Sequence, residues 1–156
     1  MLLDIVTGSD TEILRTVCEP VTQFDKSLKK LAEDMIETMH EAKGLGIAAP
    51  QIGVNSRVFI VTFDYGQKDE RQVVMANPEI TYFSDEKDVA EEGCLSLPKV
   101  FGNVERPMEI VVKYQNLRGE EVSLRLEGLN ARVVQHELDH LNGVLFIDKL
   151  ADPMVM

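Results

Sequence analysis

Residues Gln135–His140 read QHELDH, and this stretch does more than any other to define the structure. It contains the pattern H-E-x-x-H, in which His136 and His140 are four residues apart. On a helix such residues lie on one face about one turn apart, so both imidazoles can bind one metal ion. Glu137 lies beside the first histidine, where its carboxylate can take a proton from water that the metal activates. The pattern therefore predicts a helix with two metal ligands and a general base.

The sequence around this motif predicts a helix from Leu129 to Leu141, ended by Asn142-Gly143. Leu129 and Val133 fall on the turns before His136 and give the helix an apolar face. Two interpretations stay open for these side chains, a place in the hydrophobic core and a place in the wall of a pocket, and both can hold.

A third metal ligand is expected, because a catalytic zinc-type site has three protein ligands and one open position. In metzincin proteases a third histidine follows the motif, but Phe146 stands at that position. The chain after His140 offers no second helix to present a carboxylate, so the ligand should lie upstream. Cys94 is the leading candidate, because Gly93 and Pro98 indicate a bent segment that can aim a thiolate. Cys18 and His40 remain alternatives.

The rest of the chain predicts one more helix and several strands. Apolar residues recur at steps of three and four within residues 25–43, with Gly44 as a stop, which indicates an amphipathic helix. A helix, then strands, then a helix is the order typical of an α+β fold with mainly antiparallel sheet. The expected strands are Arg57–Phe63, Val73–Ala76, Ile80–Phe83, Ile110–Tyr114 and Val122–Leu126.

Composition sets further limits. A chain of 156 residues favours one domain, residues 1–156, and a net charge of −11 disfavours nucleic-acid binding. Cys18 and Cys94 are the only cysteines, which argues against a secreted disulfide scaffold and favours the cytoplasm. The sequence contains no apolar run of about 18 residues, so we expect no membrane span.

Three segments together resemble the signature motifs of the peptide deformylase family. They occur in the family's order at compatible separations, and the resemblance covers nearly the whole chain. Leu97 departs mildly from the pattern, because valine or isoleucine is frequent there. The segments are GLGIAAPQ at Gly44–Gln51, EGCLS at Glu92–Ser96 and QHELDH at Gln135–His140.

The resemblance implies antiparallel β-sheets packed around a central C-terminal helix that carries H-E-x-x-H. It implies Fe(II) as the usual metal, with Zn(II), Ni(II) or Co(II) as substitutes, and a general base that later donates a proton. Gln51 and the backbone N–H of Leu95 would stabilise an oxyanion. Leu45 and Gly46 would pair with substrate backbone, Leu129 and Val133 could line a methionine pocket, and Arg106 is a further candidate for substrate contact. The implied metal ligands are Cys94, His136 and His140, and the implied base is Glu137.

The activity implied by the resemblance is hydrolysis of the N-formyl group from formyl-methionyl nascent polypeptides, with release of formate. We expect a monomer that contacts the ribosome transiently at most, because little chain follows the metal helix. Two other classes compete with this interpretation. Another small metallopeptidase could use the same helix, and a non-catalytic relative could bind peptides, although such a relative would lack a ligand or the base.

Overall fold

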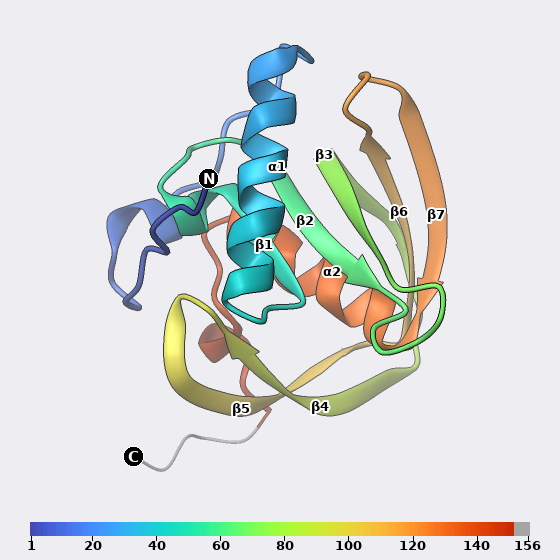
Figure 1. Ribbon diagram of the computed structural model, residues 1–156. Helices are drawn as coiled ribbons and strands as arrows, with labels where there is room; N and C mark the ends of the chain where they lie inside the picture. The colour runs from blue at the N-terminus through green and yellow to red at the C-terminus, as the bar shows by residue number, and fades with distance from the viewer. Residues whose placement is uncertain (152–156) are drawn as a thin grey trace.

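The computed structural model describes residues 1–151, and residues 152–156 lie outside the described part of the chain. Two α-helices, seven strands and three short 3-10 helices make up the described residues (Figure 1). None of the described helices is long and apolar enough to cross a membrane. The elements are α1 (Lys26–Glu41), β1 (Gly46–Ala48), β2 (Val58–Phe63), β3 (Arg71–Phe83), β4 (Lys87–Cys94), β5 (Leu97–Pro107), β6 (Glu109–Gln115), β7 (Glu121–Glu127) and α2 (Gly128–Leu141), with 3-10 helices at Glu12–Arg15, Ala49–Ile52 and Phe146–Lys149.

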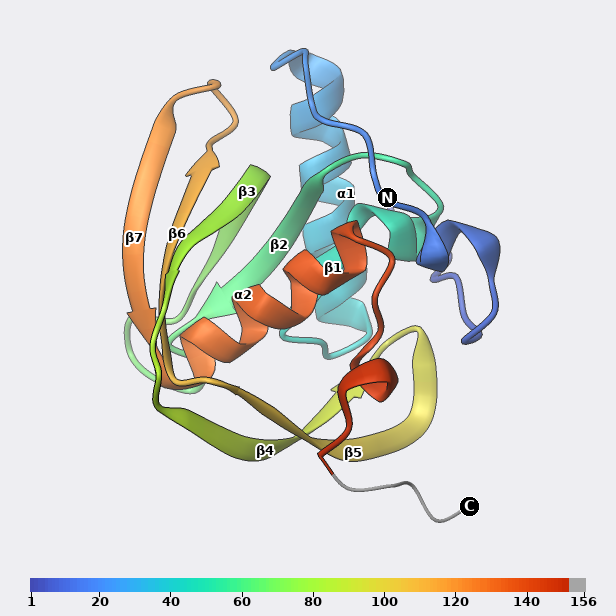
Figure 2. The same cartoon turned by 180° about the vertical axis from the view of Figure 1, so that it is seen from behind.

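The strands form two antiparallel sheets. The larger sheet has the order β1-β2-β3-β6-β7, and β4 and β5 form a separate hairpin. Figures 1 and 2, seen from opposite sides, place α1 on one face of the larger sheet and α2 on the other. The hairpin lies beyond α2, so the motif helix is enclosed between the larger sheet and the hairpin. This arrangement confirms the predicted α+β class with a C-terminal helix at its centre.

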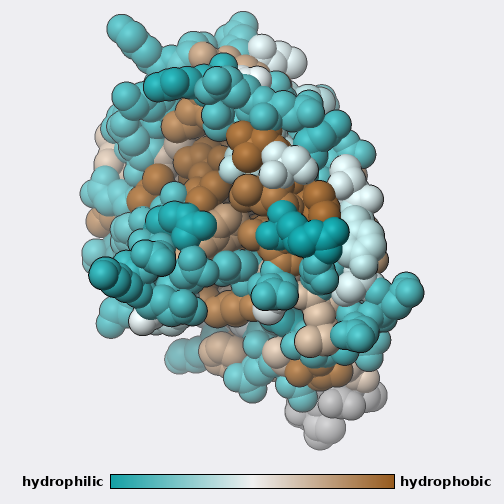
Figure 3. Space-filling model, turned by 90° about the vertical axis from the view of Figure 1, so that its right-hand side faces the viewer, coloured by the Kyte–Doolittle hydropathy of each residue, from teal (hydrophilic) through white to brown (hydrophobic). Residues whose placement is uncertain are grey.

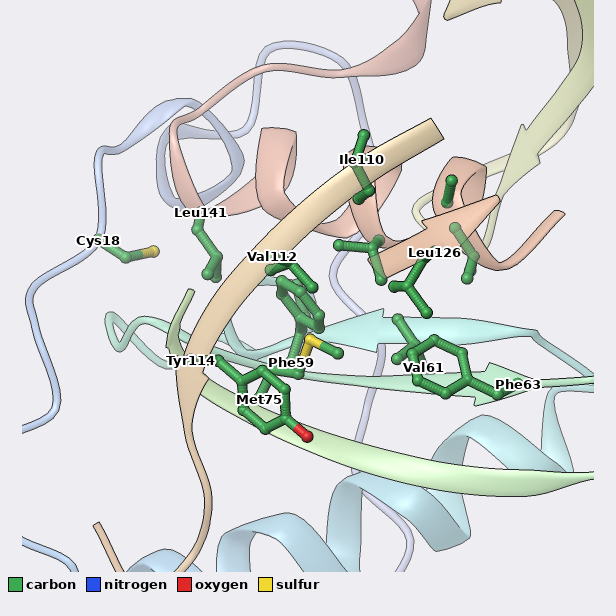
Figure 4. Close-up of a cluster of buried hydrophobic side chains, with 14 residues drawn as sticks. Cys18, Phe59, Val61, Phe63, Met75, Ile110, Val112, Tyr114, Leu126 and Leu141 are labelled. Atoms are coloured by element: carbon green, nitrogen blue, oxygen red, sulfur yellow. The ribbon is translucent and has the colours of Figure 1, made fainter. Parts of the chain in front are cut away.

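The hydrophobic core has a part on each face of the larger sheet. All six residues of β2 are buried, because the strand has a helix on either side. Phe59 and Val61 face α2 and pack with Val134 and Leu141 (Figure 4). Ile60 belongs to a second cluster with residues of α1. A strand buried on both faces is mainly apolar, which is why residues 58–63 show no alternation, with Thr62 as the one polar residue of β2.

Towards β7 the cover of the sheet is less complete. Val122 and Leu124 of β7 pack against the core but are only partly buried, and Ile80 of β3 is in the same situation. Figure 3 shows the side of the molecule on which β7 lies, and hydrophobic side chains gather there between hydrophilic ones.

The predicted elements match the structure with three differences, of which the first is β1, a three-residue strand that was not among the expected strands. The expected strands at 73–76 and 80–83 are one strand, β3, whose pairing with β6 is shifted between Ala76 and Glu79 and again between Ile80 and Tyr82. Pro78 has no N–H to donate and falls at the first shift, so the interruption is a bulge and not the end of a strand. The bend expected around Cys94 is the tip of the β4–β5 hairpin. The two strands of this hairpin were not predicted, because they are largely polar and show no apolar pattern.

Candidate metal centre

Cys94, His136 and His140 come together in the folded chain. The Cys94 Sγ at the end of β4 lies 3.2 Å from Nε2 of His140 on α2. One ligand atom from each of the three residues lies within 4.8 Å of the others. A tetrahedral ion bound at ~2.0–2.3 Å holds its ligands roughly 3.5 Å apart, so a thiolate and two imidazoles at these separations fit a divalent transition metal.

The two alternative ligands lie elsewhere. Cys18 is buried in the core cluster between α2 and the sheet, and burial raises the pKa of its thiol. His40 lies in the last turn of α1 and is exposed. The structure therefore brings Cys94 to the two motif histidines and leaves the other two candidates apart from them.

Glu92 fixes the orientation of His136. Its Oε1 lies 2.8 Å from Nδ1 of His136, which leaves Nε2 of that ring to face the site. Two guanidinium groups hold the same carboxylate: Arg106 at 2.6 and 2.9 Å, and Arg132 at 2.6 Å. Arg106 also donates to Asp139 at 2.9 Å. A carboxylate bound to the far nitrogen of a metal-binding histidine sets its tautomer and ring direction.

The charges around the ligands favour a cation at their centre. Burial opposes protonation of His136, but hydrogen bonds with Cys94 and Glu92 raise its pKa to about 10. Burial and the neighbouring positive charge of His136 hold the pKa of His140 well below its usual range, which keeps that ring neutral. The groups that stabilise positive charge on one ring would equally stabilise a divalent ion beside it.

Glu137 lies beside the ligands and outside the ion pairs that hold Glu92. Its Oε2 is 4.0 Å from Nε2 of His136, and its Oε1 is buried with no hydrogen-bond partner among the described residues. Burial is the main reason that its pKa is raised to about 7. A carboxyl group with a pKa near neutrality can both accept and return a proton. Gly46 of β1 makes room for it, because a Cβ there would lie 2.6 Å from Oε2 of Glu137.

Gln51 is aimed into the same site. The Ala48 N–H donates to its Oε1 at 2.9 Å, which fixes the direction of the amide. Its Nε2 then lies 3.5 Å from the Cys94 Sγ and 3.2 Å from the Ser96 Oγ. This amide nitrogen is a donor held next to the metal ligands, as an oxyanion-stabilising role requires.

A cavity of about 490 Å³ opens onto the site. That volume is within the ~300–1,000 Å³ usual for small-molecule sites. The predicted substrate-binding residues that line it are Leu45, Gly46, Leu129 and Val133, and Leu95, a predicted oxyanion donor, lines it too.

Arg106 has a different place. It does not line the cavity formed by the described residues, and it is only 2% exposed, with its guanidinium bound to Glu92 and Asp139. The structure places this side chain in the ion-pair network around Glu92 and not in the wall of the cavity.

The sequence did not predict the ion-pair network around Glu92. Glu92 belongs to one of the three motifs, but the sequence predicted no role for Glu92 or for Arg132. A signal was present, because Arg132 is four residues before His136 and therefore lies on the same face of the predicted helix as that ligand. An arginine at such a position requires a buried carboxylate as its partner.

A helix bearing H-E-x-x-H, enclosed by antiparallel sheets and joined by a cysteine from a hairpin, defines a metal-dependent hydrolase. Comparison with known proteins narrows this class, because residues 2–155 match the family described as polypeptide deformylase. The chain belongs to the peptide deformylase family, whose members depend on a metal ion and remove the N-formyl group from new polypeptides.

Known peptide deformylases are similar in sequence to this chain along most of its length. Peptide deformylase of Thermotoga maritima is 52% identical over 139 residues, which cover 89% of this chain and 82% of that protein. That of Synechocystis is 42% identical over 145 residues, or 93% and 78% of the two chains. The crystal structure from Thermotoga maritima matches with a TM-score of 0.91 at 49% identity, over 97% of this chain and 99% of that one. A structure from Acinetobacter baumannii with Met-Ala-Ser bound has a TM-score of 0.88 at 42% identity, over 96% and 99%.

Proposed function

We propose that this chain removes N-formyl groups with a divalent metal held by Cys94, His136 and His140 and with Glu137 as general base. The observation that carries the proposal is the meeting of these three ligands within 4.8 Å beside a buried carboxyl group whose pKa is about 7. The ligand set suits Fe(II) or Zn(II), and we propose Fe(II) as the native ion, with Ni(II) or Co(II) as working substitutes.

A divalent ion bound there would supply a Lewis acid that lowers the pKa of water from ~16 towards ~7. Glu137 takes the proton from the attacking water through Oε1, the oxygen without a partner among the described residues. It later gives that proton to the leaving amine, which departs as the new N-terminus while formate is released. One carboxyl group therefore serves both halves of the reaction, which a pKa near 7 allows.

The oxyanion that forms when water attacks the formyl carbon needs hydrogen-bond donors. The Nε2 of Gln51 and the backbone N–H of Leu95 are the proposed donors, and both residues line the cavity. Each donor of this kind is worth about 3 kcal/mol in the transition state. Gln51 is held by the Ala48 N–H, so little reorganisation is needed when charge develops.

The substrate would bind as an extended chain along the Leu45–Gly46 backbone, with its methionine side chain against Leu129 and Val133. Val133 is buried and Leu129 is 49% exposed, so the pair offers an apolar wall from the base of the cavity to its mouth. We propose that residues 1–156 form one catalytic domain that works as a monomer in the cytoplasm and contacts the ribosome transiently at most.

Anaerobic purification, followed by metal analysis and a formate-release assay on formyl-Met-Ala-Ser, tests these assignments. Glu137→Gln should keep the metal and lose about 10²–10⁴-fold in kcat. Cys94→Ala should lose the metal, whereas Cys18→Ala, the matched control at the other cysteine, should keep it. A Cys94→Ala protein with full metal content would remove that residue from the ligand set, and a Glu137→Gln enzyme with normal turnover would remove the base.

The same assay separates the competing class. Cleavage of unformylated internal peptide bonds without formate release would indicate a metallopeptidase. Iron as the bound metal, with activity that falls on exposure to air, would support Fe(II), because Fe(II) and a thiolate ligand are both open to oxidation.

A further inference from the structure

The mouth of the cavity carries two lysines. Lys43 lies in the segment between α1 and β1, and Lys99 lies in β5 near the tip of the β4–β5 hairpin; both line the cavity. Both residues are exposed. Positive charge at this place contrasts with the chain as a whole, whose net charge is −11.

Neither ammonium group is used by the protein itself. Within residues 1–151, the ammonium groups of Lys43 and Lys99 have no hydrogen-bond or ion-pair partner, whereas that of Lys30 is paired with Asp34 and that of Lys149 with Asp139. Two unpaired cations at the entrance to a substrate site are free to meet charges on the substrate.

The local backbone does not account for lysine at either position. Lys43 has a φ of 59° and Lys99 a φ of 65°, which is the left-handed region that glycine and asparagine adopt more easily. Lys43 lies in the turn after α1, and Lys99 lies in β5 where its pairing with β4 is irregular. Both residues line the cavity, so their presence there calls for another explanation.

The other charges at the site leave the mouth positive. Deeper in the cavity Glu92 is paired with Arg106 and Arg132, and Glu137 lies 4.0 Å from Nε2 of His136. Glu91 is the one exposed carboxylate among the residues that line the cavity, so it offsets one of the two lysines. Charges farther away act weakly on a bound peptide, because 0.1 M salt screens exposed charges beyond about 10 Å.

The register of the substrate indicates which of its residues would meet these lysines. Gly46 lies against Glu137, so the formyl group must react near that residue. Lys43 is three residues before Gly46, which corresponds to at most about 10 Å along an extended chain at ~3.3 Å per residue. A peptide whose formyl end lies at Gly46 would thus bring the residues that follow its methionine level with Lys43.

From this placement we infer that Lys43 and Lys99 select formylated chains with acidic side chains at the second and third positions. The inference rests on the proposed function and adds to it a preference among substrates. It requires only exposed ion pairs, so the effect is moderate: about threefold to tenfold in kcat/KM at low ionic strength. The preference should shrink as salt is added, because these pairs lie at the surface.

The test compares formyl-Met-Asp-Glu, formyl-Met-Asn-Gln and formyl-Met-Lys-Lys by formate release with the metal-loaded enzyme. The acidic peptide should be used about threefold to tenfold better than the basic one at ~0.1 M salt, where charges outside the cavity mouth are screened, and nearly equally at ~1 M. The ratio of the two kcat/KM values is the readout, because it is independent of the amount of active enzyme in a preparation.

Three variants test whether Lys43 and Lys99 cause the difference in kcat/KM between the acidic and the basic peptide. The double variant Lys43→Glu, Lys99→Glu should reverse the preference, and Glu91→Gln should increase it. Lys68→Gln, which removes an exposed lysine outside the cavity, is the matched control and should leave the ratio as in the wild type.

The outcomes separate this inference from the proposed function. Formate released equally from all three peptides, or a double variant with the wild-type ratio, would overturn the charge preference and leave the proposed function intact. A wild-type enzyme that releases formate from none of the peptides would overturn both.

Discussion

Replacing Glu92 with glutamine should destabilise the fold and weaken metal retention at the same time. The carboxylate accepts hydrogen bonds from Arg106 at 2.6 and 2.9 Å and from Arg132 at 2.6 Å, and it lies 2.8 Å from Nδ1 of His136. All four residues are buried or nearly so. Glutamine has almost the same shape but no charge, and its NH₂ group would face the N–H donors of Arg106 and Arg132.

The expected size follows from the groups that are left behind. Removing one partner of a buried ion pair costs about 3–5 kcal/mol, because the remaining charge is uncompensated. Arg106 keeps Asp139 at 2.9 Å and Arg132 keeps Asp88 at 2.9 Å, so we expect a loss near ~3 kcal/mol in the free energy of unfolding. Loss of the group that orients His136 should weaken metal binding about 10–100-fold.

Urea unfolding of the metal-free protein measures the first effect, and competition with a chelator measures the second. With a slope of ~1–3 kcal/mol per molar urea, the midpoint should fall by at least about 1 M. Glu105→Gln is the matched control, because Glu105 is exposed on β5 next to Arg106. A Glu92→Gln protein that behaves like this control in both assays would refute the role given to the network.

Three further results are expected. Gly46→Ala should lower kcat about 100-fold while the metal stays bound, since the new Cβ would lie 2.6 Å from Oε2 of Glu137; normal kinetics with full metal content would contradict this. Burial opposes ionisation of Glu92, but hydrogen bonds from His136 and Arg106 hold its pKa far below 4.5, so its stabilisation is present above pH 4.5 and is lost as the pH falls further. Unfolding free energies measured from pH 7 to pH 3 should therefore fall less steeply in Glu92→Gln than in the wild type. Gln51→Ala should lower kcat about 100-fold or more without loss of metal, as kinetics and metal analysis would show, and an unchanged kcat would exclude it as an oxyanion donor.

Local sequence patterns predicted the parts of the fold that depend on local periodicity. The two α-helices follow from apolar residues at helical spacing, and Asp25 caps α1 by accepting from the N–H groups of Ser27 and Leu28. The strands of the larger sheet other than β1 were predicted because they are apolar or alternate, whereas β1, with three residues, is too short to show a pattern. The β4–β5 hairpin was missed, since its strands are polar and pair with each other outside the larger sheet.

The sequence by itself determined that two histidines and a glutamate share one turn of a helix, because a spacing of four residues is a property of the helix and needs no other part of the chain. It also carried the three motifs that identify the family. Which distant residue meets that helix was left to the tertiary structure: Cys94 stands 42 residues before His136, and only the hairpin brings its sulfur to the two rings. The same is true of the carboxylate that holds His136 and of the arginines that hold Glu92. Such contacts form between residues that are distant in the sequence and that packing brings together, so no local sequence pattern predicts which buried charges will pair.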